Sequence, residues 1–167
     1  MAMNNYLSII TLNINGLNAP IKRHRIAEWI RKHDPHISCL QETISGQKTY
    51  TDWKWRAGNK FSKQINRKKK TGVAILISDK IDFQRRAKKR DPEGHIIIIK
   101  GRIHQEDINI VNIYAPNIGA PKYIKKILED FKKDIDSNKI IVGDFNNPIV
   151  KNGQIFQTKY QQGYCVT

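Results

Sequence analysis

One segment near the end of the sequence, Lys139 to Asn146, restricts the fold more than any other. It reads Lys-Ile-Ile-Val-Gly-Asp-Phe-Asn, so an apolar, β-branched run stops at a glycine, and an acid and an amide follow two positions apart. Such a run is typical of a buried strand. A carboxylate directly after a buried strand lies at the end of a sheet, where α/β folds build their sites. The segment therefore predicts a covered sheet with polar chemistry at one edge.

Further segments with strand character extend this sheet. Leu7 to Ile14, Ile37 to Leu40, Gly94 to Ile103 and Asp107 to Ile113 are rich in β-branched residues. The run from Gly72 to Ile77 is apolar at each position after the glycine, as expected for a strand covered on both faces. Several such runs in 167 residues predict one domain with a substantial core.

Two helices are expected between these strands. Pro20 is suited to the first turn of a helix, and Asp34 and Pro35 end it. A second apolar face with helical spacing runs from Pro121 to Asp136. The order of elements favours a mixed or antiparallel sheet that carries helices on one face, an α/β (α+β) fold, over strict strand and helix alternation. If a second sheet stacks on the first, the chain supplies only part of it.

The charge of the chain indicates its class of partner. Lys and Arg number 30 against 15 Asp and Glu, which gives a net charge of +15 and a pI near 9.9. Such a chain attracts polyanions, and nucleic acid is the commonest of these. No basic amphipathic helix favours an anionic membrane surface instead.

Two basic runs are candidate contacts for the phosphate backbone of a nucleic acid. Lys54 to Lys70 contains eight Lys or Arg residues and no acid, and Arg85 to Arg90 adds five more. Either run also fits a nuclear-localisation signal or a plain solvated surface. The candidate contacts are Lys63, Arg67, Lys68, Lys69, Lys70, Arg85, Arg86, Lys88, Lys89 and Arg90.

The two cysteines, Cys39 and Cys165, fit neither a zinc site nor a disulfide framework. Cys39 lies inside an apolar segment, where a buried free thiol in a reducing compartment is expected. The N-terminus lacks the features of a secretory signal, and no apolar run approaches membrane-spanning length. We expect an intracellular, soluble protein without a membrane partner, and the basic runs favour the nucleus.

Five polar residues share one context, because each lies at the end of an expected strand: Asn13, Glu42, Tyr114, Asp144 and Asn146. Glu42 is suited to bind a hard cation such as Mg²⁺. Asp144 is suited to orient or deprotonate a water molecule. The two asparagines can hold that water or a phosphate oxygen, and Tyr114 can donate to phosphate. Together they suggest metal-assisted hydrolysis of a phosphodiester.

Each of these residues also has a purely structural interpretation. Asn13 in Asn-Ile-Asn-Gly is a common turn former, and Asp144 with Asn146 can close an Asx turn. Glu42 fits a solvated surface, and Tyr114 fits packing at a strand end. The functional signal is their joint occurrence, and periodicity alone does not establish that they meet in space.

Four motifs occur in order along the chain: Thr11 to Leu17, Cys39 to Thr43, Val111 to Asn117 and Gly143 to Asn146. Together they resemble the motifs of the endonuclease/exonuclease/phosphatase superfamily. Within it, the chain resembles most closely the endonuclease domain of long interspersed element (LINE) retrotransposons. The similarity runs from about Tyr6 to Pro148. It predicts a truncated domain over 6–148 and a divergent tail over 149–167.

The resemblance implies a four-layer α/β sandwich, here with an incomplete second sheet, that nicks DNA with Mg²⁺ or, alternatively, Mn²⁺. By resemblance, Glu42 is the principal metal ligand and Asn13 places the phosphate and the water. Tyr114 contacts the phosphate, Asp144 positions or activates the nucleophile, and Asn146 supports the same group. No organic cofactor is implied.

The sequence departs from the family after Pro148, where nothing matches the further aspartate and the Asp-His pair that complete the family's site. We therefore expect a marginally stable, aggregation-prone monomer with weak or no nuclease activity. Two alternatives stay open at this point: an inactive basic remnant that binds nucleic acid, and the unselected product of a decayed element.

Overall fold

The computed structural model of the chain describes residues 7–43, 61–65, 72–132, 138–146, 149–151 and 154–156, and for the strands at 61–65, 149–151 and 154–156 it describes the backbone only. The predictions made for Arg67, Lys68, Lys69, Lys70 and Cys165 lie outside the described residues, as does the side chain of Lys63.

The first sheet contains β1 (Ile9–Asn13), β2 (Ile37–Gln41), β3 (Phe61–Ile65) and β4 (Val73–Ser78) in the order β1-β2-β4-β3. β1 and β2 are parallel, and the other pairs are antiparallel. Every residue of β2 and β4 is buried, as the apolar runs predict. β3 was not predicted, because its sequence mixes polar and apolar residues and only its pairing with β4 defines it.

The second sheet contains β5 (Phe83–Arg90), β6 (Ile96–Ile103), β7 (Glu106–Tyr114) and β8 (Lys139–Asp144) in that order. β7 and β8 are parallel, and the other pairs are antiparallel. The basic run predicted only as a charge cluster forms most of β5. Its lysines and arginines occupy the edge of the sheet, where charge opposes pairing with other chains.

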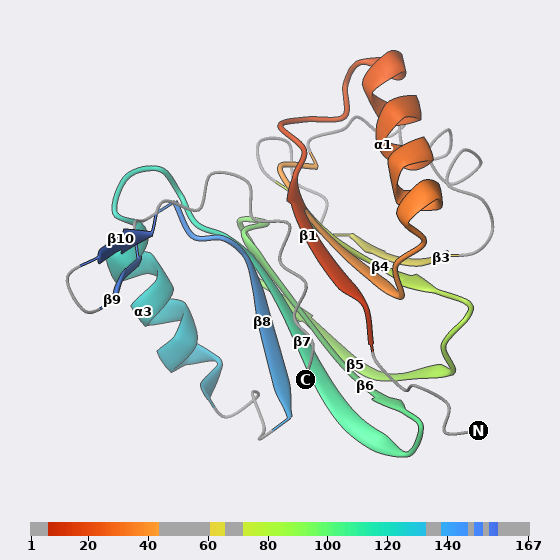
Figure 1. Cartoon of the computed structure of the whole chain (residues 1–167). Coiled ribbons are helices and arrows are strands. Elements are labelled where there is room, and N and C mark those ends of the chain that lie inside the picture. The colour runs from red at the N-terminus through yellow and green to blue at the C-terminus, as the bar shows by residue number, and fades with distance from the viewer. Residues whose placement is uncertain are drawn as a thin grey trace.

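In the described part of the chain, helices cover the outer faces of both sheets (Figure 1). α1 (Pro20–His33) lies on the first sheet, and α3 (Ala120–Asp130) lies on the second. α1 has the predicted bounds, and the backbone N–H of Asp34 closes it by donating to the carbonyl of Ile30 at 2.8 Å. α3 ends before the predicted Asp136. Helix, sheet, sheet and helix make four layers, which confirms the predicted α/β sandwich; the second sheet has four described strands.

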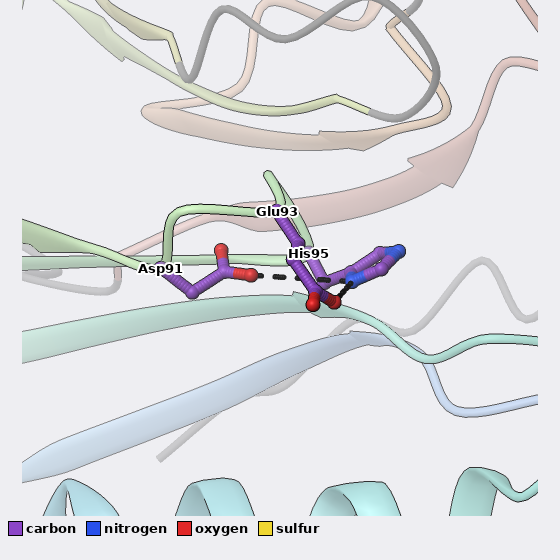
Figure 2. Close-up of side chains that lie close together, drawn as sticks. All are labelled: Asp91, Glu93 and His95. Carbon is purple, nitrogen blue, oxygen red and sulfur yellow. Dashed lines mark ion pairs between the residues drawn. The ribbon is translucent and has the colours of Figure 1, made fainter.

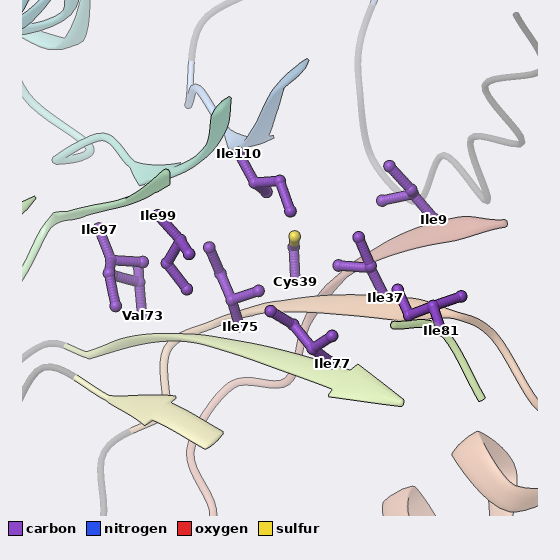
Figure 3. Packing of buried hydrophobic residues seen from close by; sticks show 10 residues of the cluster. All are labelled: Ile9, Ile37, Cys39, Val73, Ile75, Ile77, Ile81, Ile97, Ile99 and Ile110. Carbon is purple, nitrogen blue, oxygen red and sulfur yellow. The ribbon is translucent and has the colours of Figure 1, made fainter. Parts of the chain in front are cut away.

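The layer between the sheets is the main apolar core. Side chains from both sheets point toward one another across it in Figure 3, and most of them are isoleucines. Val73, Ile75 and Ile77 of β4 are β-branched and face this layer, and their burial holds the sheets together. The other face of β4, with Ala74 and Leu76, packs under α1. Cys39 lies in this layer as a free thiol, as predicted, and burial raises its pKa. This thiol is therefore structural.

A short hairpin follows the second sheet. Its strands β9 (Ile149–Lys151) and β10 (Gln154–Phe156) pair antiparallel. The sequence predicts no strand beyond Pro148, so this pairing is an addition to the expected architecture. Within the described residues, no helix combines the length and the apolar character needed to span a bilayer.

Gly143 tests how tightly β7 and β8 pair beside Asp144. Its φ of +145° disfavours other residues, and an added Cβ would overlap with the carbonyl oxygen of Ile113. We expect Gly143→Ala to lower the free energy of unfolding by more than about 2 kcal/mol, measured by urea denaturation.

Gly119→Ala is the matched control. Gly119 also has a positive φ, +77°, but no atom lies within 4 Å of the position that an added methyl group would take. The control should cost only the backbone strain, about 1 kcal/mol. Equal losses in the two variants would show that the close approach at Gly143 is unimportant.

Candidate functional site

The site forms where strands of both sheets end. Asn13 is the last residue of β1, Glu42 directly follows β2, and Tyr114 and Asp144 end β7 and β8. Because β1 and β2 are parallel, their carboxyl ends meet at one edge, and the same holds for β7 and β8. β1 and β8 lie side by side across the two sheets (Figure 1), so the two edges form one site.

The side-chain amide of Asn13 joins the two sheets. Its Nδ2 donates to Oε1 of Glu42 at 2.9 Å and to Oδ2 of Asp144 at 2.7 Å. The two carboxylates are therefore both within hydrogen-bonding distance of one nitrogen, although they are 102 positions apart in the sequence. Such a pair of oxygen donors can share a divalent cation or a water bound to it.

The structural interpretation of these residues also holds. The backbone N–H of Asn146 donates to Oδ1 of Asp144 at 3.0 Å, and that of Asn15 donates to Oδ1 of Asn13 at 3.0 Å. Asn146 itself is fixed by its Nδ2, which donates to the carbonyl of Ala115 at 2.6 Å. The Asx turns therefore orient the same carboxylate and amide groups that face the site, and the two interpretations do not exclude one another.

The backbone of Glu42 has an unusual conformation. Its φ is +55°, in the left-handed region that costs a residue other than glycine about 1–3 kcal/mol. Its neighbours hold it there, because the N–H of Gly16 donates to its carbonyl at 2.8 Å and the N–H of Thr43 donates to the carbonyl of Gly72 at 2.9 Å. The turn directs the carboxylate toward Asn13.

Tyr114 completes the group. Burial raises its pKa to about 12, and a hydrogen bond to Glu42 and the negative charges of Glu42 and Asp144 act in the same direction. The phenol therefore stays protonated at physiological pH. A protonated phenol can donate a hydrogen bond but cannot act as a base.

A second titratable cluster, which the sequence did not predict, lies beside Tyr114. Figure 2 shows Asp91, Glu93 and His95, with Nδ1 of His95 at 3.9 Å from Asp91 and 3.4 Å from Glu93. The ring of His95 lies 6.1 Å from that of Tyr114, between centroids. The three side chains can hold a cation. Their mutual ion pairs, and the hydrogen bond from the N–H of Ile96 to Asp91, also explain them as a clamp on the turn between β5 and β6.

The basic candidates of the second run lie on one edge strand. Arg85, Arg86, Lys88, Lys89 and Arg90 are exposed on β5, and Arg86 pairs with Asp107 at 3.2 Å. Lys88 is exposed but partly shielded from water, and this partial desolvation lowers its pKa; the neighbouring charges of Arg90 and Arg85 add to the effect. Arg90 is in register with Ile97 of β6, and Ile97 is in register with Asn112 of β7. The C-terminal end of β5 therefore lies at the same end of the sheet as the C-terminal end of β7, which carries Tyr114.

Two stacked mixed sheets with helices outside them define the class of this protein, the four-layer α/β sandwich. Residues 10–149 match the Endonuclease/Exonuclease/phosphatase family, and the chain belongs to it.

Its relatives include transposon and repair proteins. The chain is 29% identical over 145 residues to a 149 kDa protein of the transposon TX1 of Xenopus laevis. This match covers 84% of the chain and 11% of the relative. It is 28% identical over 165 residues to the DNA repair nuclease APEX1 of Danio rerio, covering 89% and 48%. The chain therefore spans at most about half the length of these curated relatives.

Solved structures support the fold. The crystal structure of TDP2 of D. rerio complexed with a single strand DNA product superposes with a TM-score of 0.69 at 16% identity, and the match covers 86% of this chain and 62% of that one. At this identity the likeness concerns the fold alone.

The environment of Tyr114 predicts how stability depends on pH. The pKa of its phenol is raised from 10.0 to about 12 in the folded chain, so the stabilisation it provides is present below pH 10 and is lost as pH rises through about 12. We expect the free energy of unfolding of the wild type to fall more steeply above pH 10 than that of Tyr114→Phe. Urea denaturation at a series of pH values measures both. Parallel curves for the two proteins would contradict the shift.

Proposed function

We propose that this chain is a Mg²⁺-dependent phosphodiesterase domain that nicks DNA, with Mn²⁺ as an alternative ion. One observation carries the proposal: the amide of Asn13 brings the carboxylates of Glu42 and Asp144 together from two sheets. Two negative charges at this distance repel each other, and a divalent cation relieves the repulsion. Carboxylate oxygens are the ligands that Mg²⁺ prefers.

The residues of the site divide the work of hydrolysis among them. Glu42 would hold the ion, which when bound neutralises charge that develops on the phosphate. Asp144, oriented by Asn13 and by the N–H of Asn146, would position the attacking water and accept its proton. Tyr114, whose phenol is protonated at physiological pH, would donate to a phosphate oxygen. Asn146 is fixed by Ala115 and would support the same oxygen or water.

DNA is the proposed substrate because charge and relatives agree. The chain carries a net charge of +15, and the basic strand β5 ends at the same end of its sheet as Tyr114 and Asp144. One relative is named a DNA repair nuclease, and one structural neighbour holds a DNA product. The transposon relative and the four motifs support a LINE origin. We further propose that the protein is a monomer, needs no organic cofactor and acts in the nucleus. The catalytic domain would span 6–148, followed by a divergent tail at 149–167.

The nicking assay tests this proposal directly. With protein in excess over supercoiled plasmid, we expect Mg²⁺-dependent nicking that EDTA abolishes, and a rate at least about 100-fold lower in Glu42→Ala and in Asp144→Ala. Glu93→Gln is the matched control, because it removes a carboxylate charge from the neighbouring cluster. The control should keep the Mg²⁺ dependence of the wild type.

Other outcomes decide against the proposal. Nicking that survives in Asp144→Ala would come from another source, and loss of activity in Glu93→Gln with full activity in Glu42→Ala would place the ion in the other cluster. A wild type that binds DNA without nicking it would favour the second candidate, an inactive nucleic-acid-binding remnant. The exposed basic strand is the observation that favours this candidate.

The role of β5 is tested by salt dependence. Lys89→Ala with Arg90→Ala removes two charges at the end of the strand nearest the site, and Lys125→Ala with Lys126→Ala removes two exposed charges from α3. Each lost phosphate contact lowers the slope of log K against log salt by about 1. We expect a decrease of about 1–2 for the β5 variant alone, measured by fluorescence anisotropy on duplex DNA. Equal slopes for the two variants would remove β5 from the interface.

A further inference from the structure

A pair of amide side chains lies buried between the two sheets. Asn112 of β7 is 0% exposed and Gln41 of β2 is 1% exposed, and Nε2 of Gln41 donates to Oδ1 of Asn112 at 2.6 Å. The side chains of the apolar core between the sheets include Cys39, two residues before Gln41, and Ile110, two residues before Asn112 (Figure 3). A polar pair at such a place requires a reason, because burying an amide is unfavourable unless its hydrogen bonds are made.

The pair makes its hydrogen bonds to several strands. Nδ2 of Asn112 donates to the carbonyls of Leu40 at 3.0 Å and Ala74 at 2.9 Å. Nε2 of Gln41 also lies 3.0 Å from Oγ1 of Thr11, to which it donates. One side chain of the second sheet is thus bonded to two strands of the first, β2 and β4, and Gln41 extends the link to β1.

This pair forms the layer directly below the candidate site. Gln41 precedes Glu42, Thr11 lies two residues before Asn13, and Asn112 lies two residues before Tyr114. Side chains alternate along a strand, so residues two apart share a face. Asp144 of β8 is in register with Tyr114, so it lies at the same level of the sheet, one layer above Asn112.

We propose that Gln41 and Asn112 are positioning residues that fix the alignment of the two sheets, so that Glu42 and Asp144 both reach the amide of Asn13. Apolar contacts between the sheets are non-directional and permit small displacements. Hydrogen bonds restrict both distance and angle, and buried polar pairs are known to select one register among several. The effect on catalysis rests on the proposed function, whereas the effect on the Asn13 contacts does not.

The double variant Gln41→Leu with Asn112→Leu tests the proposal. It removes both amides together, so neither amide is left as a lone buried polar side chain. The carbonyls of Leu40 and Ala74 and the hydroxyl of Thr11 lose a donor, so we expect a folded chain of lower stability. The first measurement is hydrogen exchange of the Asn13 side-chain amide by NMR, which needs no activity. We expect exchange at least about tenfold faster than in the wild type, because this amide loses its two carboxylate acceptors.

The second measurement is nicking as a function of Mg²⁺ concentration. We expect the rate at saturating Mg²⁺ to fall at least about tenfold and the half-saturating concentration to rise, because a misplaced group loses the geometry that the reaction requires. Ile110→Val is the matched control, since Ile110 lies on the same face of β7 two residues from Asn112 and is equally buried. It should change thermal stability without changing either measurement.

The outcomes separate the two proposals. A folded double variant with slow Asn13 exchange and wild-type Mg²⁺ dependence would overturn the positioning role, as would equal effects in Ile110→Val. A wild type without nicking activity would overturn the proposed function and leave the exchange measurement decisive for the pair. If the double variant does not fold, Thr11→Val replaces it, because this isosteric change removes only the hydroxyl acceptor of Gln41. It should then shift both measurements in the same direction.

Discussion

One amide nitrogen determines the geometry of the site. Nδ2 of Asn13 donates to a carboxylate from each sheet, and this shared donor offsets part of the repulsion between the two negative charges. The fold makes this contact possible in two ways. Parallel pairing brings the carboxyl ends of neighbouring strands to one end of each sheet, and stacking of the sheets brings these two ends together. The position of the polar residues therefore depends on the same strand pairing and sheet packing that stabilise the sandwich.

The electrostatics of the chain have two scales. Over the whole molecule the charge is strongly positive, which attracts a polyanion from a distance. At the strand ends the charge is locally negative, because Glu42 and Asp144 face the same space. A phosphodiester drawn in by the first field would be repelled by the second. A divalent cation held by the carboxylates reconciles the two, which is why the metal is central to the proposed chemistry.

The sequence predicted the features that depend on local pattern. Apolar, β-branched runs identified β2, β4, β6, β7 and β8, and the polar residues that follow strands identified the group around Asn13. The sequence did not predict β5 as a strand, because arginine and lysine show no strand pattern. The extended conformation of β5 results from its pairing with Ile97 to Ile103. The contact between Gln41 and Asn112 was also missed, since a polar residue within a strand does not reveal its partner until the opposite sheet is known. His95 was missed because its neighbours form a turn without periodicity.

The left-handed backbone of Glu42 has a consequence for how the sequence is used. At such a position glycine or asparagine would satisfy the turn with less strain, and the other positive-φ residues of the site, Asn15 and Asn146, follow that preference. Glutamate departs from it, as do His104 and Gln105 in the turn between β6 and β7, so the turn alone does not determine which residue stands here. A chain maintained for stability alone would gain by giving this residue up. Replacing Glu42 by glycine would remove the carboxylate and relax the turn at once, which separates the chemical role of this residue from its structural one.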